Sequence, residues 1–119
     1  MKIDRAKLLA AIPTNCGGYA RERVEVPGLD DVFARESSSL EAQQLSRRLM
    51  AAKTEQEEVN AMAQNAICVL CDETGAAVLT SEDLPTVMQW PARIIRAITR
   101  ASNKAGGVSD DAEADAKNE

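Results

Sequence analysis

The residues of this 119-residue chain whose spacing suggests chemistry are its cysteines. Cys68 and Cys71 are separated by two residues, the spacing of a redox dithiol or of half a zinc site, and Cys16 is the third thiol. The thiols of a redox pair lie at the N-terminus of a helix, where free backbone amides lower a thiol pKa. These two cysteines instead lie near the end of an apolar run. Because a free cysteine also behaves as a small hydrophobic residue, we interpret the pair as core packing. A small thiol or metal-binding protein is the alternative.

Other catalytic chemistry has little support in the composition. The chain contains no histidine, which removes the commonest general base and the imidazole ligands of metal sites. Paired acids at residues 72–73 and 82–83 stand beside predicted turns and helix caps, where acids have local structural roles. Gly17 and Gly18 lack the lysine that completes a phosphate-binding loop. We therefore expect no catalytic residue, no metal and no cofactor, and predict that the protein is not an enzyme.

Charge and hydropathy limit the classes of partner. The 14 basic and 19 acidic residues give a net charge of −5, whereas general nucleic-acid binders neutralise phosphates with cations. No apolar run approaches the ~20 residues that span a bilayer, and the charged start of the sequence lacks the apolar segment of a signal peptide. An odd number of thiols without an export signal is typical of a reducing cytoplasm. We expect neither nucleic acid nor membrane as a partner.

The elements that would position these residues begin with a short helix and a hairpin. The pattern predicts a helix over residues 4–12, capped by Asp4 and ended by Pro13, with its leucines and isoleucine on one face. Two short alternating runs flank a turn at Pro27 and predict a β-hairpin over about residues 21–36. Because a lone hairpin is marginal in water, one of its faces should pack on helices.

Helical periodicity then dominates residues 38–103. Ser38 and Glu41 form a capping-box pattern at the start, and Thr54 repeats it, either opening a second helix or lying inside one long helix. The stripe predicted for the first of these helices consists of Leu40, Leu45, Leu49 and Ala52.

The strongest helical pattern runs from residue 54 to residue 70 and ends at a turn where Gly75 can adopt a positive φ. A strand over residues 67–71, followed by a second strand, is the competing interpretation there. A short helix begins at residue 81, and Pro91 favours the start of the last one.

The fold class predicted from this order is mainly α. We expect one folded domain over residues 1–105, with an N-terminal β-hairpin, followed by a disordered acidic tail over residues 106–119. The scarcity of aromatic residues predicts a thin aliphatic core, and hence modest stability or a partner that completes the fold. Arg93, Arg96 and Arg100 form a basic stripe on the outer face of the last helix, either a solvated face or a surface for an acidic partner or for the tail itself.

Four stretches of the sequence carry a resemblance to a known family. Residues 66–75 (AICVLCDETG) are a hydrophobic segment that ends in an acidic turn, and residues 78–84 (VLTSEDL) join an apolar pair to a helix start. Residues 91–98 (PARIIRAI) begin an amphipathic helix, and residues 24–36 (VEVPGLDDVFARE) supply the hairpin. In this order the sequence resembles the tail assembly chaperones of long-tailed, siphovirus-type bacteriophages.

The resemblance implies a small, largely helical, non-enzymatic protein of the host cell cytoplasm that is absent from the mature virion. It implies binding to the tape measure protein and help in recruiting the tail tube protein, and it leaves oligomerisation open. Such a chaperone needs exposed apolar surface. The residues predicted to contact partners are Val78, Leu79, Leu84, Val87, Met88 and Trp90, together with Arg93, Arg96 and Arg100.

The resemblance also implies a longer product made by ribosomal frameshifting near the end of the gene. Residues 116–118 (AKN) can be encoded by GCA-AAA-AAC, which contains a slippery heptamer. The tail would then tether an extension domain. A non-phage regulatory adaptor, whose acidic tail mimics nucleic acid, is a further alternative.

Overall fold

A computed structural model of the chain describes residues 3–108. Five α-helices, one 3₁₀ turn and three short strands follow one another within this range. Their order is α1 (Arg5–Ala11), β1 (Arg21–Arg23), β2 (Phe33–Arg35), α2 (Ser39–Ala51), α3 (Glu55–Val69), β3 (Leu70–Cys71), the turn η1 (Ser81–Asp83), α4 (Leu84–Val87) and α5 (Ala92–Ala105). The mainly helical fold with an N-terminal hairpin is therefore confirmed.

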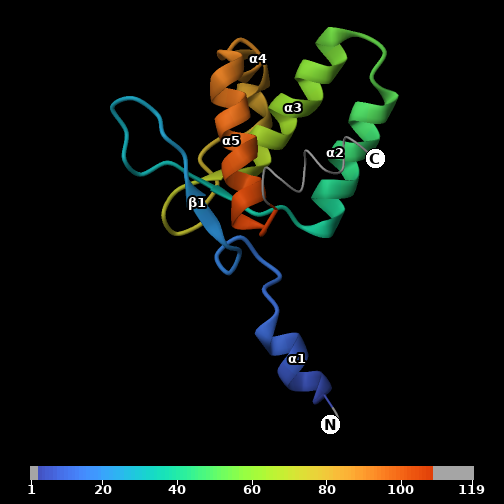
Figure 1. The fold of residues 1–119 in the computed structure, drawn as a ribbon, viewed down its shortest axis with the longest axis vertical. Helices are drawn as coiled ribbons and strands as arrows, with labels where there is room; N and C mark the ends of the chain where they lie inside the picture. The colour runs from blue at the N-terminus through green and yellow to red at the C-terminus, as the bar shows by residue number, and fades with distance from the viewer. Residues whose placement is uncertain (1–2, 109–119) are drawn as a thin grey trace.

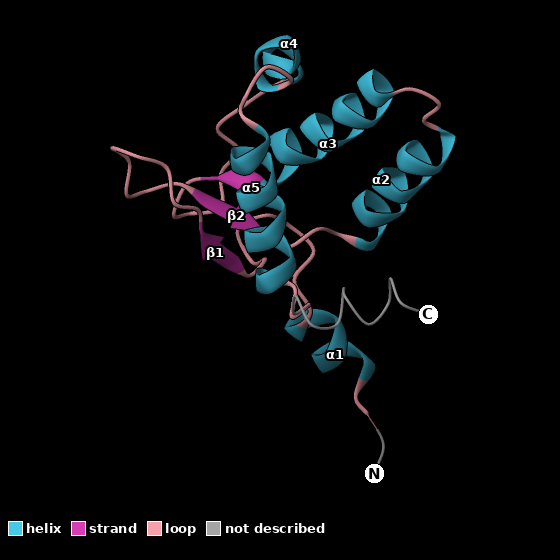
Figure 2. Cartoon of the chain, turned by 45° about the horizontal axis from the view of Figure 1, so that its top comes forward, coloured by secondary structure: helices cyan, strands magenta, loops and turns pink. Residues whose placement is uncertain are grey.

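The strands form one antiparallel sheet in the order β1-β2-β3. Ala34 in the central strand lies opposite Glu22 of β1 and Leu70 of β3. The third strand follows α3 without a loop. The helix predicted here is confirmed as far as Val69. The competing prediction of a strand is right for the next two residues, Leu70 and Cys71. Helix α5 packs against β1 and β2, as Figures 1 and 2 show.

The core lies between the sheet, α3, α4 and α5, and its side chains are small. Its buried members are Val24, Ala34, Ala63, Ala66, Val69, Leu70, Val87, Ile98 and Ala101. Within residues 3–108 none of the three aromatic side chains is fully buried. The prediction of a thin aliphatic core is confirmed, and its small side chains let the helices approach the sheet closely.

A buried ion pair joins the sheet to the start of α2. Arg35 donates through two guanidinium nitrogens to the two carboxylate oxygens of Glu41, at 2.8 and 2.7 Å, and its side chain is 6% exposed. The same carboxylate accepts from the backbone N–H of Ser38 at 2.9 Å, and the Ser38 hydroxyl accepts from the N–H of Glu41 at 3.1 Å. The predicted capping box is therefore present, and its glutamate also holds a charge in the sheet.

Arg35 makes two further contacts, with Ser102 and Tyr19. The hydroxyl of Ser102 in α5 donates to the carbonyl oxygen of Arg35 at 2.7 Å, and both residues are buried. The Arg35 guanidinium carbon also lies 5.4 Å from the centroid of the Tyr19 ring, a cation–π distance. Through these contacts, Arg35 in β2 connects the N-terminal loop, α2 and α5.

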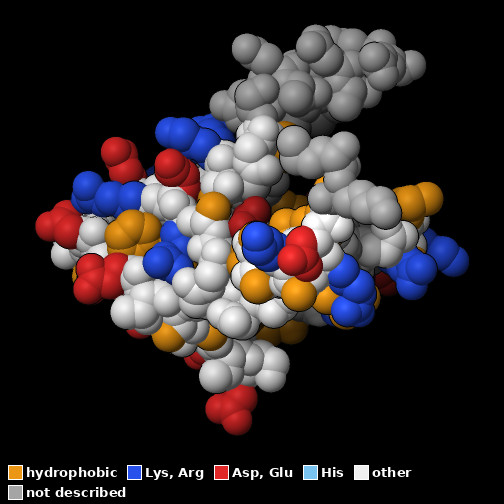
Figure 3. Space-filling view, turned by 90° about the horizontal axis from the view of Figure 1, so that it is seen from below, with side chains coloured by type: hydrophobic (Ala, Val, Ile, Leu, Met, Phe, Trp, Pro, Cys, Tyr) orange, Lys and Arg blue, Asp and Glu red, His pale blue; other side chains and the backbone are white. Residues whose placement is uncertain are grey.

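Helix α1 begins as predicted but does not join the core. The Asp4 carboxylate accepts from the N–H groups of Ala6 and Lys7, at 2.9 and 3.5 Å, so it caps the helix. The helix nevertheless projects away from the body (Figure 1), and Leu8 and Ile12 are 47% and 57% exposed. The space-filling view from this end shows hydrophobic and charged side chains mixed over the surface (Figure 3).

Helix α2 departs further from the prediction, because none of its residues is buried. It forms a hairpin with α3 (Figure 2), but the two helices leave a hollow of about 610 Å³ that is lined largely by polar side chains such as Asn60 and Gln64. Leu40 and Leu49 of its predicted stripe are consequently 68% and 37% exposed. The Thr54 cap does open a separate helix, since its hydroxyl accepts from the N–H of Glu57 at 3.2 Å.

Helix α5 ends in a hydrogen-bonded reversal rather than a loose hinge. Gly107 has φ +83°, its N–H donates to the Lys104 carbonyl at 3.0 Å, and the N–H of Val108 donates to the Asn103 carbonyl at 2.8 Å. This is a Schellman-type cap, which turns the chain back at the helix end. The rest of the predicted acidic tail, residues 109–119, lies outside the described residues.

Candidate interaction surface

Trp90 lies at the break between α4 and α5 and lines two apolar grooves. The backbone N–H of Trp90 donates to the Val87 carbonyl at 3.1 Å, in a turn that directly follows α4. Pro91 then caps the start of α5. The indole is partly buried against the core. A tryptophan held this way presents a large apolar face from a fixed position, which suits an anchor for a partner.

The first groove, which we call the Leu29 groove, has a volume of about 350 Å³. It runs between the β1–β2 loop, the segment after β3 and the first half of α5. All of its lining residues are apolar: Val26, Leu29, Val32, Leu70, Val78, Leu79, Trp90, Pro91, Ile94 and Ile98. Leu29 and Val78 at its rim are 50% and 54% exposed, so the groove is open to a ligand.

The second groove, which we call the Met88 groove, is also lined by Trp90 and has a volume of about 470 Å³. It is formed by α3, α4 and the start of α5, with one residue from α2. Its lining residues are Leu49, Glu58, Val59, Met62, Ala63, Val87, Met88, Trp90, Ala92, Ile95 and Arg96. Methionine side chains adapt their shape to varied apolar ligands, so this groove suits a partner of loosely defined sequence.

Six of the predicted contact residues line the two grooves, and Val87 and Arg96 are among them. Val78 and Leu79 line the Leu29 groove, Met88 lines the second groove, and Trp90 lines both. Leu84 instead packs against the core and lines neither groove.

The prediction that Val87 is a surface residue is wrong, because it is 1% exposed. The short helix α4 packs on α3 and turns Val87 inward, so that it forms the floor of the Met88 groove.

Reasoning from the sequence missed Leu29 and Met62. Leu29 stands in the turn of the hairpin, where an apolar side chain among polar neighbours was the available signal. Met62 follows the helical periodicity of the core stripe, and nothing in that spacing distinguishes a groove wall from the core.

The basic stripe lies where the periodicity of α5 predicts it. Arg93, Arg96 and Arg100 are all exposed on the outer face of the helix. Arg96 also lines the Met88 groove, so a cation borders the apolar surface there. A partner that seats in this groove therefore meets positive charge at its edge.

The three cysteines are free thiols in different environments. Cys68 is exposed in the last turn of α3, whereas Cys71 is buried in β3, and Cys16 lies in the N-terminal loop. Partial desolvation of Cys68 and burial of Cys71 raise the pKa of both thiols, which disfavours the reactive thiolate. No group of three or more cysteine, aspartate or glutamate side chains within residues 3–108 is placed to hold a metal ion. The geometry offers the thiol or metal alternative no support.

The remaining acidic pairs have structural roles. One Asp72 carboxylate oxygen accepts from the backbone N–H and the hydroxyl of Thr74 and from the N–H of Ala76, at 2.8, 2.6 and 3.1 Å. These hydrogen bonds, those from Thr74 above all, lower the pKa of Asp72. Asp83 likewise accepts from the N–H of Thr80 at 2.8 Å and so forms a capping box with Thr80, the N-cap of η1. In the described part of the chain no helix has the length and apolar character needed to cross a membrane.

Comparison with known proteins gives a likeness among solved structures. No protein-family model matches the sequence, and no curated protein matches it either. Among solved structures, the fold is similar to that of the tail assembly chaperone of bacteriophage HK97, with a TM-score of 0.57 and 22% sequence identity. The match covers 82% of this chain and 90% of that one, so it extends over nearly the whole fold.

Proposed function

We propose that this chain is a tail assembly chaperone of a long-tailed bacteriophage. In this role it binds the tape measure protein in the host cell cytoplasm, helps to recruit tail tube subunits, and is absent from the mature virion. The observation that carries the proposal is the fold shared with the HK97 chaperone over most of both chains, which agrees with the resemblance of residues 66–98.

The two grooves suggest how such a client would be held. An amphipathic helix presents apolar side chains at positions i, i+3, i+4 and i+7, and such side chains could fill both grooves across the Trp90 indole. Arg93 and Arg96 would then favour clients with acidic residues beside the apolar stripe. A client of this kind is insoluble or prone to aggregation when its apolar face is exposed, which is the need that a chaperone meets.

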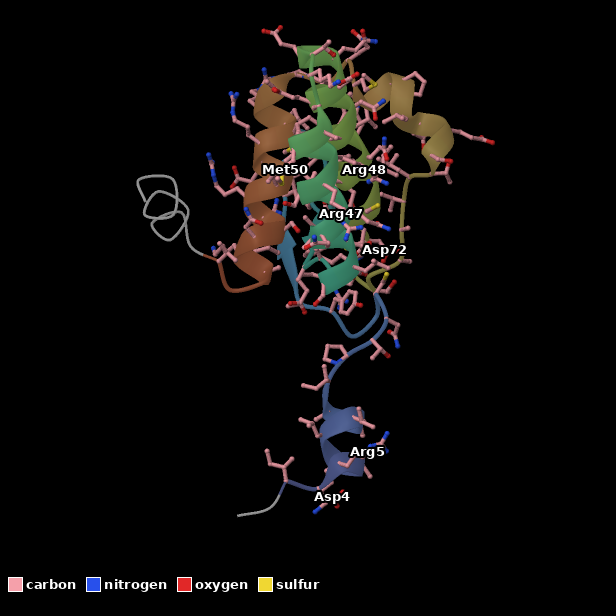
Figure 4. The ribbon with its side chains drawn as sticks, turned by 90° about the vertical axis from the view of Figure 1, so that its right-hand side faces the viewer. Asp4, Arg5, Arg47, Arg48, Met50 and Asp72 are labelled. Carbon is pink, nitrogen blue, oxygen red and sulfur yellow. The ribbon has the colours of Figure 1, made fainter. Side chains whose placement is uncertain are left out.

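The test is co-expression with the tape measure protein encoded in the same genome, followed by co-purification. We expect a soluble complex when both proteins are made and an insoluble client when it is made alone. Trp90→Ala and Val78→Asp should each reduce the co-purified client at least tenfold. Met50→Asp is the matched control, because Met50 is 84% exposed on α2 and lines neither groove (Figure 4).

Two outcomes would overturn the proposal. The first is the absence of a complex under conditions in which both proteins are soluble. The second is a complex that Trp90→Ala and Val78→Asp leave intact, which would place the binding surface elsewhere. Adding purified tail tube protein to the complex tests the recruitment step, and a ternary complex is the expected result.

The longer frameshifted product is a separate part of the proposal. The residues concerned, 116–118, lie outside the described residues, and the codons of the gene decide the matter. Codons that cannot pair again after a one-nucleotide backward slip would exclude a frameshift at this position.

A further inference from the structure

We propose that residues 109–119 of this chain bind along the basic face of its own helix α5. This face comprises Arg93, Arg96, Arg100 and Lys104, which follow one another at helical spacing and are all exposed. The inference goes beyond the proposed function and does not depend on it.

Two arginines of the basic face, Arg93 and Arg96, lack an ion-pair partner among the described residues. The Lys104 ammonium lies 3.9 Å from a Glu22 carboxylate oxygen in a largely exposed pair. Three other acidic side chains border the face: Glu25 and Asp30 beside its start, and Glu58 across the Met88 groove. Asp30 is paired with Arg23 at 2.9 Å. None of these three is within ion-pair distance of Arg93 or Arg96.

The segment that follows Val108 has the complementary charge. Residues 109–119 (SDDAEADAKNE) carry five acidic side chains and one lysine, with no large apolar residue that would direct them to the core. Extended residues two apart lie roughly 7 Å apart, and helix residues three or four apart lie about 5–6 Å apart, so an alternating acidic segment matches the spacing of the arginines.

Helix α5 ends in a reversal of the chain next to Lys104, the last residue of the basic face. The Schellman-type cap at Gly107 reverses the chain, so that Val108 turns back toward the helix it has just left. The 14 residues of α5 rise about 21 Å, whereas 11 extended residues reach about 36–40 Å. The segment is therefore long enough to reach Arg93 at the far end of the face.

The experiment compares ¹⁵N–¹H spectra of the full chain with those of a chain that ends at Val108. The signals to read are the backbone and guanidinium N–H groups of Arg93 and Arg96, which are more than ten residues from the truncation and escape its local effect. We expect these signals to shift between the two chains at low salt. The shift should vanish in 1 M NaCl, because salt screens exposed charge pairs.

Charge variants of the full chain make the test specific. Changing Asp110, Asp111 and Asp115 to Asn and Glu113 to Gln should reproduce the spectrum of the truncated chain at Arg93 and Arg96. Arg93→Lys with Arg96→Lys should keep the salt-sensitive shift of the neighbouring α5 amides, and Arg93→Glu with Arg96→Glu should abolish it. The matched control is Arg47→Glu with Arg48→Glu on α2 (Figure 4), which should leave it unchanged.

The core signals of Ile98 show whether each variant is folded. The proposal is overturned when the two spectra coincide at Arg93 and Arg96 at low salt. It is also overturned when the difference depends on protein concentration, since the segment would then bind a second copy.

Discussion

The ion pair between Arg35 and Glu41 yields the sharpest prediction about stability. Glu41→Gln keeps the shape of the side chain but removes its charge, and it leaves the Arg35 guanidinium buried without a carboxylate. Breaking a fully buried pair on one side costs about 3–5 kcal/mol. The Glu41 side chain is 23% exposed and water screens part of the interaction, so we expect a loss of about 2–3 kcal/mol at pH 7. For a domain of this size that loss lowers the Tm by roughly 8–15 °C.

The pH dependence of this loss separates the charge from the packing. The hydrogen bonds from Arg35 above all, and those from Ser38, hold the pKa of Glu41 below its usual value. A carboxyl whose pKa is lowered by folding stabilises the fold fully above its unfolded pKa of about 4.3, and this stability is lost as the pH falls through the folded pKa. The difference in free energy of unfolding between the native chain and Glu41→Gln should therefore be constant from pH 7 to about pH 5, and it should disappear below pH 4.

Urea denaturation followed by Trp90 fluorescence and by circular dichroism at each pH measures this difference. Glu73→Gln is the control, because Glu73 is exposed in a turn. A loss below about 0.5 kcal/mol at pH 7 would contradict the reasoning, and so would a difference that stays constant down to pH 3.

Three further predictions concern backbone strain, a buried hydroxyl and thiol reactivity. Gly75→Ala should lower the free energy of unfolding, measured with urea, by about 3 kcal/mol, because φ is +89° and a Cβ there would meet a backbone carbonyl of the N-terminal loop. Gly28→Ala is the control: its φ is +86° but its surroundings are open, so it should cost only about 1 kcal/mol. Equal costs at the two positions would contradict the clash. Ser102→Ala should cost about 1–2 kcal/mol in the same assay, since it leaves a buried carbonyl without its donor; a neutral result would show that water replaces the hydroxyl. Cys68, which is exposed, should react with a thiol reagent in the native state, and Cys71, which is buried, should react only as the chain unfolds; equal rates would show that β3 opens readily.

The local signals in the sequence predicted most helix boundaries. Ser38, Thr54 and Asp4 each cap a helix as their spacing indicates, since a capping hydrogen bond depends on residues no more than three positions away. Strand β3 could not be assigned in this way. Its pairing of Cys71 with Phe33 joins residues far apart in the chain, and no periodicity within a two-residue strand reveals it.

Burial was the quantity that the sequence predicted least well. Leu40 of α2 and Leu8 of α1 satisfy the helical apolar pattern, yet both are exposed, because the sheet, α3 and α5 close the core without these helices. Val87 shows the opposite error, since the sequence predicts it as part of the exposed apolar surface and it is buried. Periodicity identifies the apolar face of a helix, but only the tertiary arrangement decides what covers that face.

Because α1 projects from the body, it should unfold independently of the rest of the chain. Seven helical residues without a buried side chain fall short of the ~12–15 that an isolated helix needs in water, so residues 3–12 should melt with a free energy near zero while the rest unfolds cooperatively. Amide hydrogen exchange would then be fast in α1 and slow in α3 and α5. Substitutions in α1 would hardly change the stability of the fold, which frees these residues to vary in evolution independently of the core.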